Sequence, residues 1–274
     1  MTAKNMYKIA FFDIDGTLVD NELPANMGIY RRIPASAKAA LVKLQELGIE
    51  PVIATGRSHQ VIAPLAAQLG VTSIISSNGA HVVYQGQLLV THPLGPTTLA
   101  AVRKRLSTTQ RPYMLESAAA LYVSDLRLFA DEKGEQPLLP VTELGQQAGL
   151  ILQVSCRGVT DGKSLAPLPA EVKAEKVAPA VVDIHLAQVS KATGIQEILQ
   201  KVGISSAEAL AFGDEENDLA MFEVVGLPIA MGNACEALKA KAGHVTETVG
   251  NHGIWAACVA LGLWQEAWTD ARDY

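Results

Sequence analysis

Short apolar runs alternate with segments of helical periodicity in the first third of the chain. Five segments carry this pattern: strands are expected at 8–13, 49–55 and 72–77, and helices at 36–48 and 58–70. Ser36 is expected to cap the first helix and Gly48 to end it. Strands that alternate with helices are typical of a parallel sheet covered by helices, so the pattern predicts an α/β fold.

The alternation breaks after residue 80. Residues 81–90 read as two strands around a Gln-Gly turn, which is the signal of an antiparallel hairpin. Further on, a helix is expected at 96–108 and strands at 120–125, 150–156 and 181–186. The Pro-rich stretch 165–180 fits no element clearly. A second lobe of mixed helix and strand content is therefore expected in this part of the chain.

The α/β pattern returns at residue 190 and continues to about residue 243. The second lobe is thus expected to be an insertion into the first. We expect residues 1–85 and 188–274 to form one core, and residues 86–187 to form an inserted cap domain. A length of 274 residues suits such an arrangement, because it exceeds what one average core needs.

Composition and charge narrow the classes of partner. Hydrophobic residues make up 49% of the chain and charged residues 18%, which suits a well-buried globular protein. The net charge of −6 offers no general attraction to nucleic acid or to an anionic membrane. The three cysteines are isolated, and the sequence contains neither a signal-peptide pattern nor an apolar stretch of roughly 20 residues. We expect a cytoplasmic protein without nucleic-acid or membrane partners, either a monomer or a weak dimer.

Two carboxylates follow the first expected strand. Side chains alternate along a strand, so Asp13 and Asp15 project to the same side. Ligands of open α/β sheets bind outside the carboxyl ends of the strands, where both residues stand. Two carboxylates this close repel unless a cation lies between them, and their oxygens suit Mg²⁺. The alternative is an acidic strand end that is solvated in an ordinary turn.

Other polar residues stand at the ends of further strands and at helix starts. Asp214 follows the apolar run 209–212, and Asp218 lies about one turn later. Thr55 and the backbone N–H of Gly56 follow the second strand, where a helix start is able to hold an anion. Lys191 begins a helix, where a cation is unfavourable unless it serves another group. Helix capping by Asp214 and Asp218, and simple solvation of Lys191, remain the alternatives.

Six motifs occur in one order: DIDGTLVD (13–20), ATGR (54–57), SSNGA (76–80), VSKATGI (189–195), FGDEEND (212–218) and AMGNA (230–234). In these motifs the sequence resembles the haloacid dehalogenase superfamily of phosphohydrolases, in its Cof-type branch with a C2 (type IIB) cap. The resemblance covers about residues 7–84 and 188–260, whereas the cap matches only in position and element content. It implies a Rossmann-like parallel-sheet core with an inserted α+β cap.

The resemblance implies roles for individual residues. Asp13 would be the nucleophile and Asp15 the general acid and base, and Mg²⁺ would be held by the Asp13 carboxylate, the Asp15 backbone carbonyl and Asp214. Four residues would hold the transferring phosphoryl group: Thr55, Gly56, Lys191 and Asn217. Three more would support the site: Arg57, Asn78 and Asp218. His252 stands where relatives usually have an acidic residue, which puts any supporting role at this position in doubt.

These roles make chemical sense together. A carboxylate that attacks phosphorus gives an aspartyl-phosphate, and Mg²⁺ and a lysine neutralise the charge of the phosphate dianion. We expect an Mg²⁺-dependent phosphatase of small phosphomonoesters, such as sugar phosphates, nucleotides, flavin mononucleotide or pyridoxal phosphate. The alternatives are a phosphotransferase or phosphomutase acting on sugar phosphates, and a non-catalytic regulator that binds a phosphometabolite.

Overall fold

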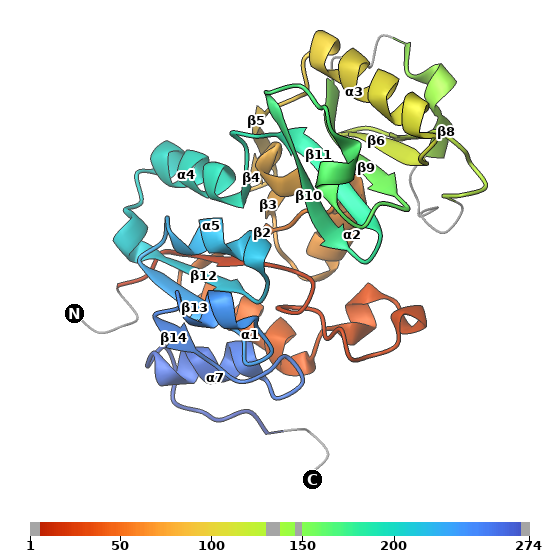
Figure 1. Cartoon of the computed structure of the whole chain (residues 1–274). Helices are drawn as coiled ribbons and strands as arrows, with labels where there is room; N and C mark the ends of the chain where they lie inside the picture. Colours follow the sequence, from red (N-terminus) through yellow and green to blue (C-terminus); the bar gives the residue numbers. More distant parts are fainter. Residues whose placement is uncertain (1–5, 130–137, 146–149, 270–274) are drawn as a thin grey trace.

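The computed structural model describes residues 6–129, 138–145 and 150–269, which form two sheets in separate lobes (Figure 1). The larger sheet has eight strands in the order β14-β13-β12-β1-β2-β3-β4-β5. Its strands are β1 (Ile9–Phe12), β2 (Glu50–Ala54), β3 (Ser73–Ser76), β4 (His81–Tyr84), β5 (Gln87–Thr91), β12 (Ala209–Gly213), β13 (Leu227–Ala230) and β14 (His244–Val245). The strands from β14 to β3 pair in parallel, and β4 and β5 add an antiparallel edge. The predicted α/β class is confirmed.

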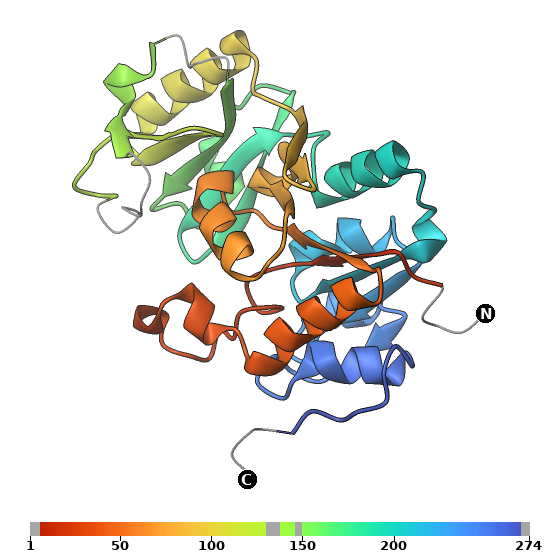
Figure 2. The same cartoon turned by 180° about the vertical axis from the view of Figure 1, so that it is seen from behind.

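Helices cover both faces of the larger sheet because its central strands are apolar on both sides. In β1, Phe12 packs with α1 (Ala35–Glu46), α2 (His59–Gln68) and α7 (Gly253–Ala260), whereas Phe11 packs on the opposite face. The helices on that face are α4 (Lys191–Val202), α5 (Leu219–Phe222) and α6 (Glu236–Lys239). Figure 2 shows α1 and α2, in orange, on the side of the sheet that is hidden in Figure 1.

The smaller sheet has six strands in the order β10-β11-β9-β6-β7-β8. They are β6 (Tyr113–Ser117), β7 (Leu121–Val123), β8 (Leu138–Pro140), β9 (Ile151–Arg157), β10 (Val172–Ala178) and β11 (Val181–Leu186). Helix α3 (Pro96–Thr109) covers one face and buries Leu99, Val102 and Leu106 against the sheet. The other face turns toward the larger sheet (Figure 1), so its side chains border the space between the lobes.

The structure differs from the sequence expectations at three places. The hairpin expected at 81–90 forms as β4 and β5, but β5 extends the larger sheet, although residue 86 was the expected start of the inserted segment. The Pro-rich stretch 165–180 contains strand β10, and its prolines lie outside that strand. Ser36 does not cap α1, because the helix starts after Pro34 and the Ser36 hydroxyl instead lies 2.9 Å from Nδ1 of His252.

Among the helices that the structure describes, none has both the length and the apolar character that crossing a membrane would require.

Candidate active site

The carboxyl ends of four neighbouring strands meet at the edge of the larger sheet that faces the smaller lobe. Asp13 follows β1, Thr55 follows β2, Ser77 follows β3 and Asp214 follows β12. The strand order β12-β1-β2-β3 makes these positions neighbours, although up to 201 residues of sequence separate them. Parallel pairing thus assembles one site from the ends of separate strands, as is usual in open α/β sheets.

Lys191 lies at the floor of this site, between two carboxylates. Its Nζ donates to Oδ1 of Asp13 at 2.6 Å and to Oδ1 of Asp218 at 2.7 Å, and all three side chains are buried. Burial lowers the pKa of Lys191, but the charges of Asp13 and Asp218 raise it by more, so this lysine stays protonated. The lysine is therefore a fixed positive charge and not a solvated side chain.

Asp13, Asp214 and Asp218 form a crowded group of carboxylates. One oxygen of each lies within 4.8 Å of the others, and all three residues are buried. Burial, and then the charges of Asp13 and Asp218, raise the pKa of Asp214 to about 8. Lys191 balances one of the three negative charges, so a bound cation would relieve the remaining repulsion. An all-oxygen donor set of this kind fits Mg²⁺ better than zinc.

Hydrogen bonds fix the orientation of two of these carboxylates. Oδ1 of Asp214 accepts from the Thr17 hydroxyl at 3.0 Å. Oδ2 of Asp218 accepts from the backbone N–H of Asp214 at 2.9 Å, so Asp218 connects the end of β12 to Lys191. Asp218 is thus placed to position both the lysine and Asp214, whereas its own oxygens are already engaged.

Gly16 provides the space in which Asp214 lies. Its φ of +91° is in the region that favours glycine, and a Cβ at this position would collide with the Asp214 carboxylate. Its carbonyl also accepts from Nδ2 of Asn233 at 2.7 Å, which ties the turn after Asp15 to the AMGNA segment. Gly16 therefore allows the turn after β1 to lie close to the Asp214 carboxylate, which follows β12.

Gly16→Ala is expected to lower kcat/KM for phosphoester hydrolysis by at least about tenfold, because the new methyl group displaces Asp214. Gly28→Ala is the matched control: Gly28 has a φ of +80°, but a Cβ there would meet no atom within 4 Å. Backbone strain at positive φ should cost each variant about 1–3 kcal/mol of unfolding free energy, and the collision with Asp214 adds to the loss in Gly16→Ala. Phosphate release and thermal unfolding measure the two effects, and equal activity losses in both variants would contradict this explanation.

Asp15 is more exposed than Asp13, Asp214 and Asp218, and its carboxylate pairs with Arg57. The guanidinium donates through Nε at 2.7 Å and through Nη2 at 2.8 Å, so the pair is bidentate. Both side chains remain more than a third exposed. The sequence assigned Arg57 only a supporting place, and the structure shows that it holds the Asp15 carboxylate at the mouth of the site.

A cleft of about 890 Å³ brings most of the predicted residues together. Seven of them line it: Asp13, Asp15, Thr55, Gly56, Arg57, Asp214 and Asn217. Lys191 and Asp218 lie behind Asp13 through the hydrogen bonds given above. Asn78 lies behind Gly56, since a Cβ on Gly56 would come within 2.9 Å of the Asn78 amide oxygen. His252 does not line the cleft; it precedes α7 and meets Ser36.

The smaller lobe contributes residues that the sequence did not single out. Gln153 donates to the carbonyl oxygen of Gly56 at 3.0 Å and to Glu116 at 2.9 Å, and it accepts from Asn78 at 3.1 Å. Asp183 lies on the same face of the small sheet and lines the cleft. Polar residues at alternating positions of β6, β9 and β11 are the signal that was available, because alternation marks a solvated or ligand-facing side of a sheet.

Comparison with known proteins gives a consistent result. The family model of the haloacid dehalogenase-like hydrolases matches residues 10–144 and 161–257. A putative phosphatase of Bacillus subtilis, YkrA, is 32% identical over 264 residues, which is 93% of this chain and 98% of the relative. A hypothetical protein from Geobacillus kaustophilus HTA426 superposes with a TM-score of 0.81 at 30% identity, covering 94% of this chain and all of the other.

A third similarity concerns the subclass. BT4131, described as a subclass IIB sugar phosphatase, superposes with a TM-score of 0.78 at 26% identity and covers 94% of this chain and all of its own. The inserted six-stranded sheet with its helix, the acidic strand ends and these similarities agree with one another. The chain therefore belongs to the haloacid dehalogenase-like hydrolases, in the subclass IIB branch that contains the Cof-type phosphatases.

Proposed function

We propose that this phosphoric monoester hydrolase uses Mg²⁺ and an aspartyl-phosphate intermediate on Asp13 to hydrolyse small phosphomonoesters. One observation carries the proposal: Asp13 lines the cleft while a buried ammonium holds one of its oxygens at 2.6 Å. That contact orients the carboxylate and leaves its other oxygen to attack phosphorus. Attack by a carboxylate divides one difficult displacement into two easier steps.

Several residues around Asp13 would bind the phosphoryl group together. Thr55 and the Gly56 N–H lie at the end of β2, and Asn217, which follows β12, lines the same cleft. Lys191 supplies positive charge beneath the group. Asp13, Asp214 and the backbone carbonyl of Asp15 would hold Mg²⁺, which when bound neutralises charge on the phosphoryl oxygens. The crowding of the carboxylates supports this assignment.

Asp15 is assigned the proton transfers. In the first step it gives a proton to the leaving oxygen, and in the second it takes one from the water that attacks the aspartyl-phosphate. Arg57 holds the Asp15 carboxylate through two hydrogen bonds, at 2.7 and 2.8 Å. Because both side chains are partly exposed, Asp15 is able to turn from Arg57 toward a leaving group in the cleft.

Removal of divalent metal is expected to lower hydrolysis of p-nitrophenyl phosphate by at least about 100-fold, because the repelling carboxylates no longer have a cation between them. Mg²⁺ should restore the activity. It should also raise the unfolding temperature without substrate, because it relieves repulsion among Asp13, Asp214 and Asp218. Full activity after exhaustive chelation, with no stabilisation by added Mg²⁺, would refute the metal requirement.

A further inference from the structure

The turn after β2, to which phosphoryl binding is assigned above, is held from both lobes. Two backbone N–H groups of the core, in the segment 77–78, donate to the carbonyl oxygens of Thr55 and Arg57, at 3.1 and 2.9 Å. The carbonyl oxygen between them, that of Gly56, instead accepts from Nε2 of Gln153 at 3.0 Å. The core therefore fixes both ends of the turn, and the small lobe holds its middle.

The carbonyl of Gly56 shares one peptide unit with the N–H of Arg57. This unit is planar and trans, so its C=O and its N–H point in opposite directions. On the side opposite Gln153, the Arg57 N–H donates to the hydroxyl oxygen of Thr55 at 3.1 Å. Gln153 is therefore connected to the Thr55 hydroxyl through a single rigid peptide.

The hydroxyl of Thr55 has one proton to donate, and Thr55 lines the cleft. A hydroxyl group that accepts a hydrogen bond directs its own proton away from that donor. Because the donor here is the Arg57 N–H, the proton of Thr55 is left for a group in the cleft. In the proposed function this group is a phosphoryl oxygen.

The side-chain amide of Gln153 is itself fixed on all sides. Its Nε2 also donates to Glu116 at 2.9 Å, and its Oε1 accepts from Nδ2 of Asn78 at 3.1 Å. The Gly56 carbonyl and the Glu116 carboxylate both require the N–H end of the amide, so its orientation is determined. Both N–H groups of this buried side chain are used, and Gln153 therefore acts on the reaction through its neighbours.

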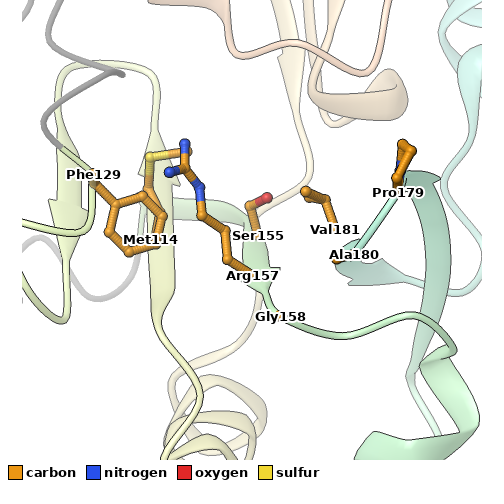
Figure 3. A pocket seen from close by; sticks show the side chains of 8 residues that line it. All are labelled: Met114, Phe129, Ser155, Arg157, Gly158, Pro179, Ala180 and Val181. Carbon is orange, nitrogen blue, oxygen red and sulfur yellow. The ribbon is translucent and has the colours of Figure 1, made fainter.

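The next residues on the same face of β9 have different partners. Ser155 and Arg157 occupy alternate positions after Gln153 and line a second pocket of the small lobe, of about 420 Å³ (Figure 3). Ser155 bonds Asp183, and Arg157 donates to the Leu128 carbonyl at 2.9 Å. These partners belong to the small lobe, whereas Gln153 reaches the turn of the core.

We propose that Gln153 is a positioning residue for phosphoryl transfer, which keeps the Thr55 hydroxyl directed at the phosphoryl group through the peptide of Gly56. The inference rests on the proposed function, because that function assigns phosphoryl binding to Thr55. It makes contact between the lobes a condition for an aligned phosphoryl site. All phosphoesters share the phosphoryl group, so the effect of Gln153 is the same for every leaving group.

Gln153→Met removes the amide and keeps the length of the side chain. It is expected to lower kcat/KM about tenfold for p-nitrophenyl phosphate and for acetyl phosphate alike, because one phosphoryl donor loses its alignment. The inhibition constant of inorganic phosphate, which has no leaving group, should rise about tenfold. A loss confined to one of the two esters would overturn the proposal, because Gln153 would then act on the leaving group.

Thr55→Val tests the route by which Gln153 acts. In this background the hydroxyl is absent, so adding Gln153→Met should lower kcat/KM by less than twofold. Losses that multiply in the double variant would overturn the proposal. Gln153→Asn keeps an amide that is one methylene too short to reach Gly56 and should repeat the tenfold loss. It decides the question if Gln153→Met does not fold, and parental activity of Gln153→Asn would contradict the proposal.

Gln60→Met is the matched control. Gln60 is also a buried glutamine that joins the lobes, since its Nε2 donates to the Ser117 carbonyl at 2.9 Å, but it does not line the cleft. Its substitution should leave kcat/KM and the phosphate inhibition constant as in the parent. Equal losses in Gln60→Met would overturn the proposal, because general loosening of the lobes would then explain them. Absence of hydrolysis of both esters by the parent protein would instead overturn the proposed function.

Discussion

Asp13→Asn is expected to lower phosphate release from p-nitrophenyl phosphate by at least about 10³-fold, with the fold retained. The amide keeps the size of the side chain but does not attack phosphorus. It also removes one negative charge from a crowded group, so the free energy of unfolding should fall little. Steady-state kinetics and thermal unfolding measure the two quantities separately.

The same motif supplies the control for this variant. Asp20 closes the DIDGTLVD segment, and its side chain accepts from the backbone N–H of Glu22 instead of lining the cleft. Asp20→Asn should therefore keep parental activity. Activity of Asp13→Asn within tenfold of the parent would show that another group attacks phosphorus.

Lys191→Met is expected to lower both activity and stability. The substitution leaves Asp13 and Asp218 buried without their shared counter-charge, which should lower the free energy of unfolding by about 3 kcal/mol. Loss of the fixed positive charge beneath the phosphoryl group should lower kcat by at least about 100-fold. Denaturant unfolding in the absence of metal, together with phosphate release in its presence, measures these effects.

Two further variants distinguish the loss of the buried positive charge from general damage to helix α4. Lys201→Met alters an exposed lysine in the last turn of the same helix and should change neither quantity. Adding Asp218→Asn to Lys191→Met should restore part of the stability, because it removes one of the uncompensated charges, but it should not restore activity. A double variant less stable than Lys191→Met would contradict the electrostatic explanation.

The sequence was most informative where function depends on the end of a strand. Asp13, Thr55 and Asp214 each follow an apolar run, so their approach to one sheet edge follows from parallel pairing alone. The sequence did not reveal the partners of Lys191, because a lysine at a helix start has the same sequence pattern whether it is solvated or buried. Its contacts with Asp13 and Asp218 exist only once α4 packs against the sheet.

The small lobe was harder to interpret, for two physical reasons. Strand β10 lies inside a Pro-rich stretch, and the prolines flank the strand. Prolines usually interrupt a strand, whereas here they stand on either side of one. The cleft-lining residues Glu116, Gln153 and Asp183 come from three strands and share no local motif. Their common position depends on antiparallel register, which nothing in a single strand specifies.

Strand β9 presents Gln153 and Ser155 to the cleft, which has a consequence for evolution and for engineering. Gln153 is tied to the Gly56 carbonyl, to Asn78 and to Glu116, so exchanging it disturbs the turn that holds the phosphate. Ser155 and Arg157 lie one and two steps farther along the same face. Ser155 lines the cleft and bonds Asp183 of the same lobe, so we expect exchanges at this position to alter the fit of a leaving group while the turn that holds the phosphate stays intact.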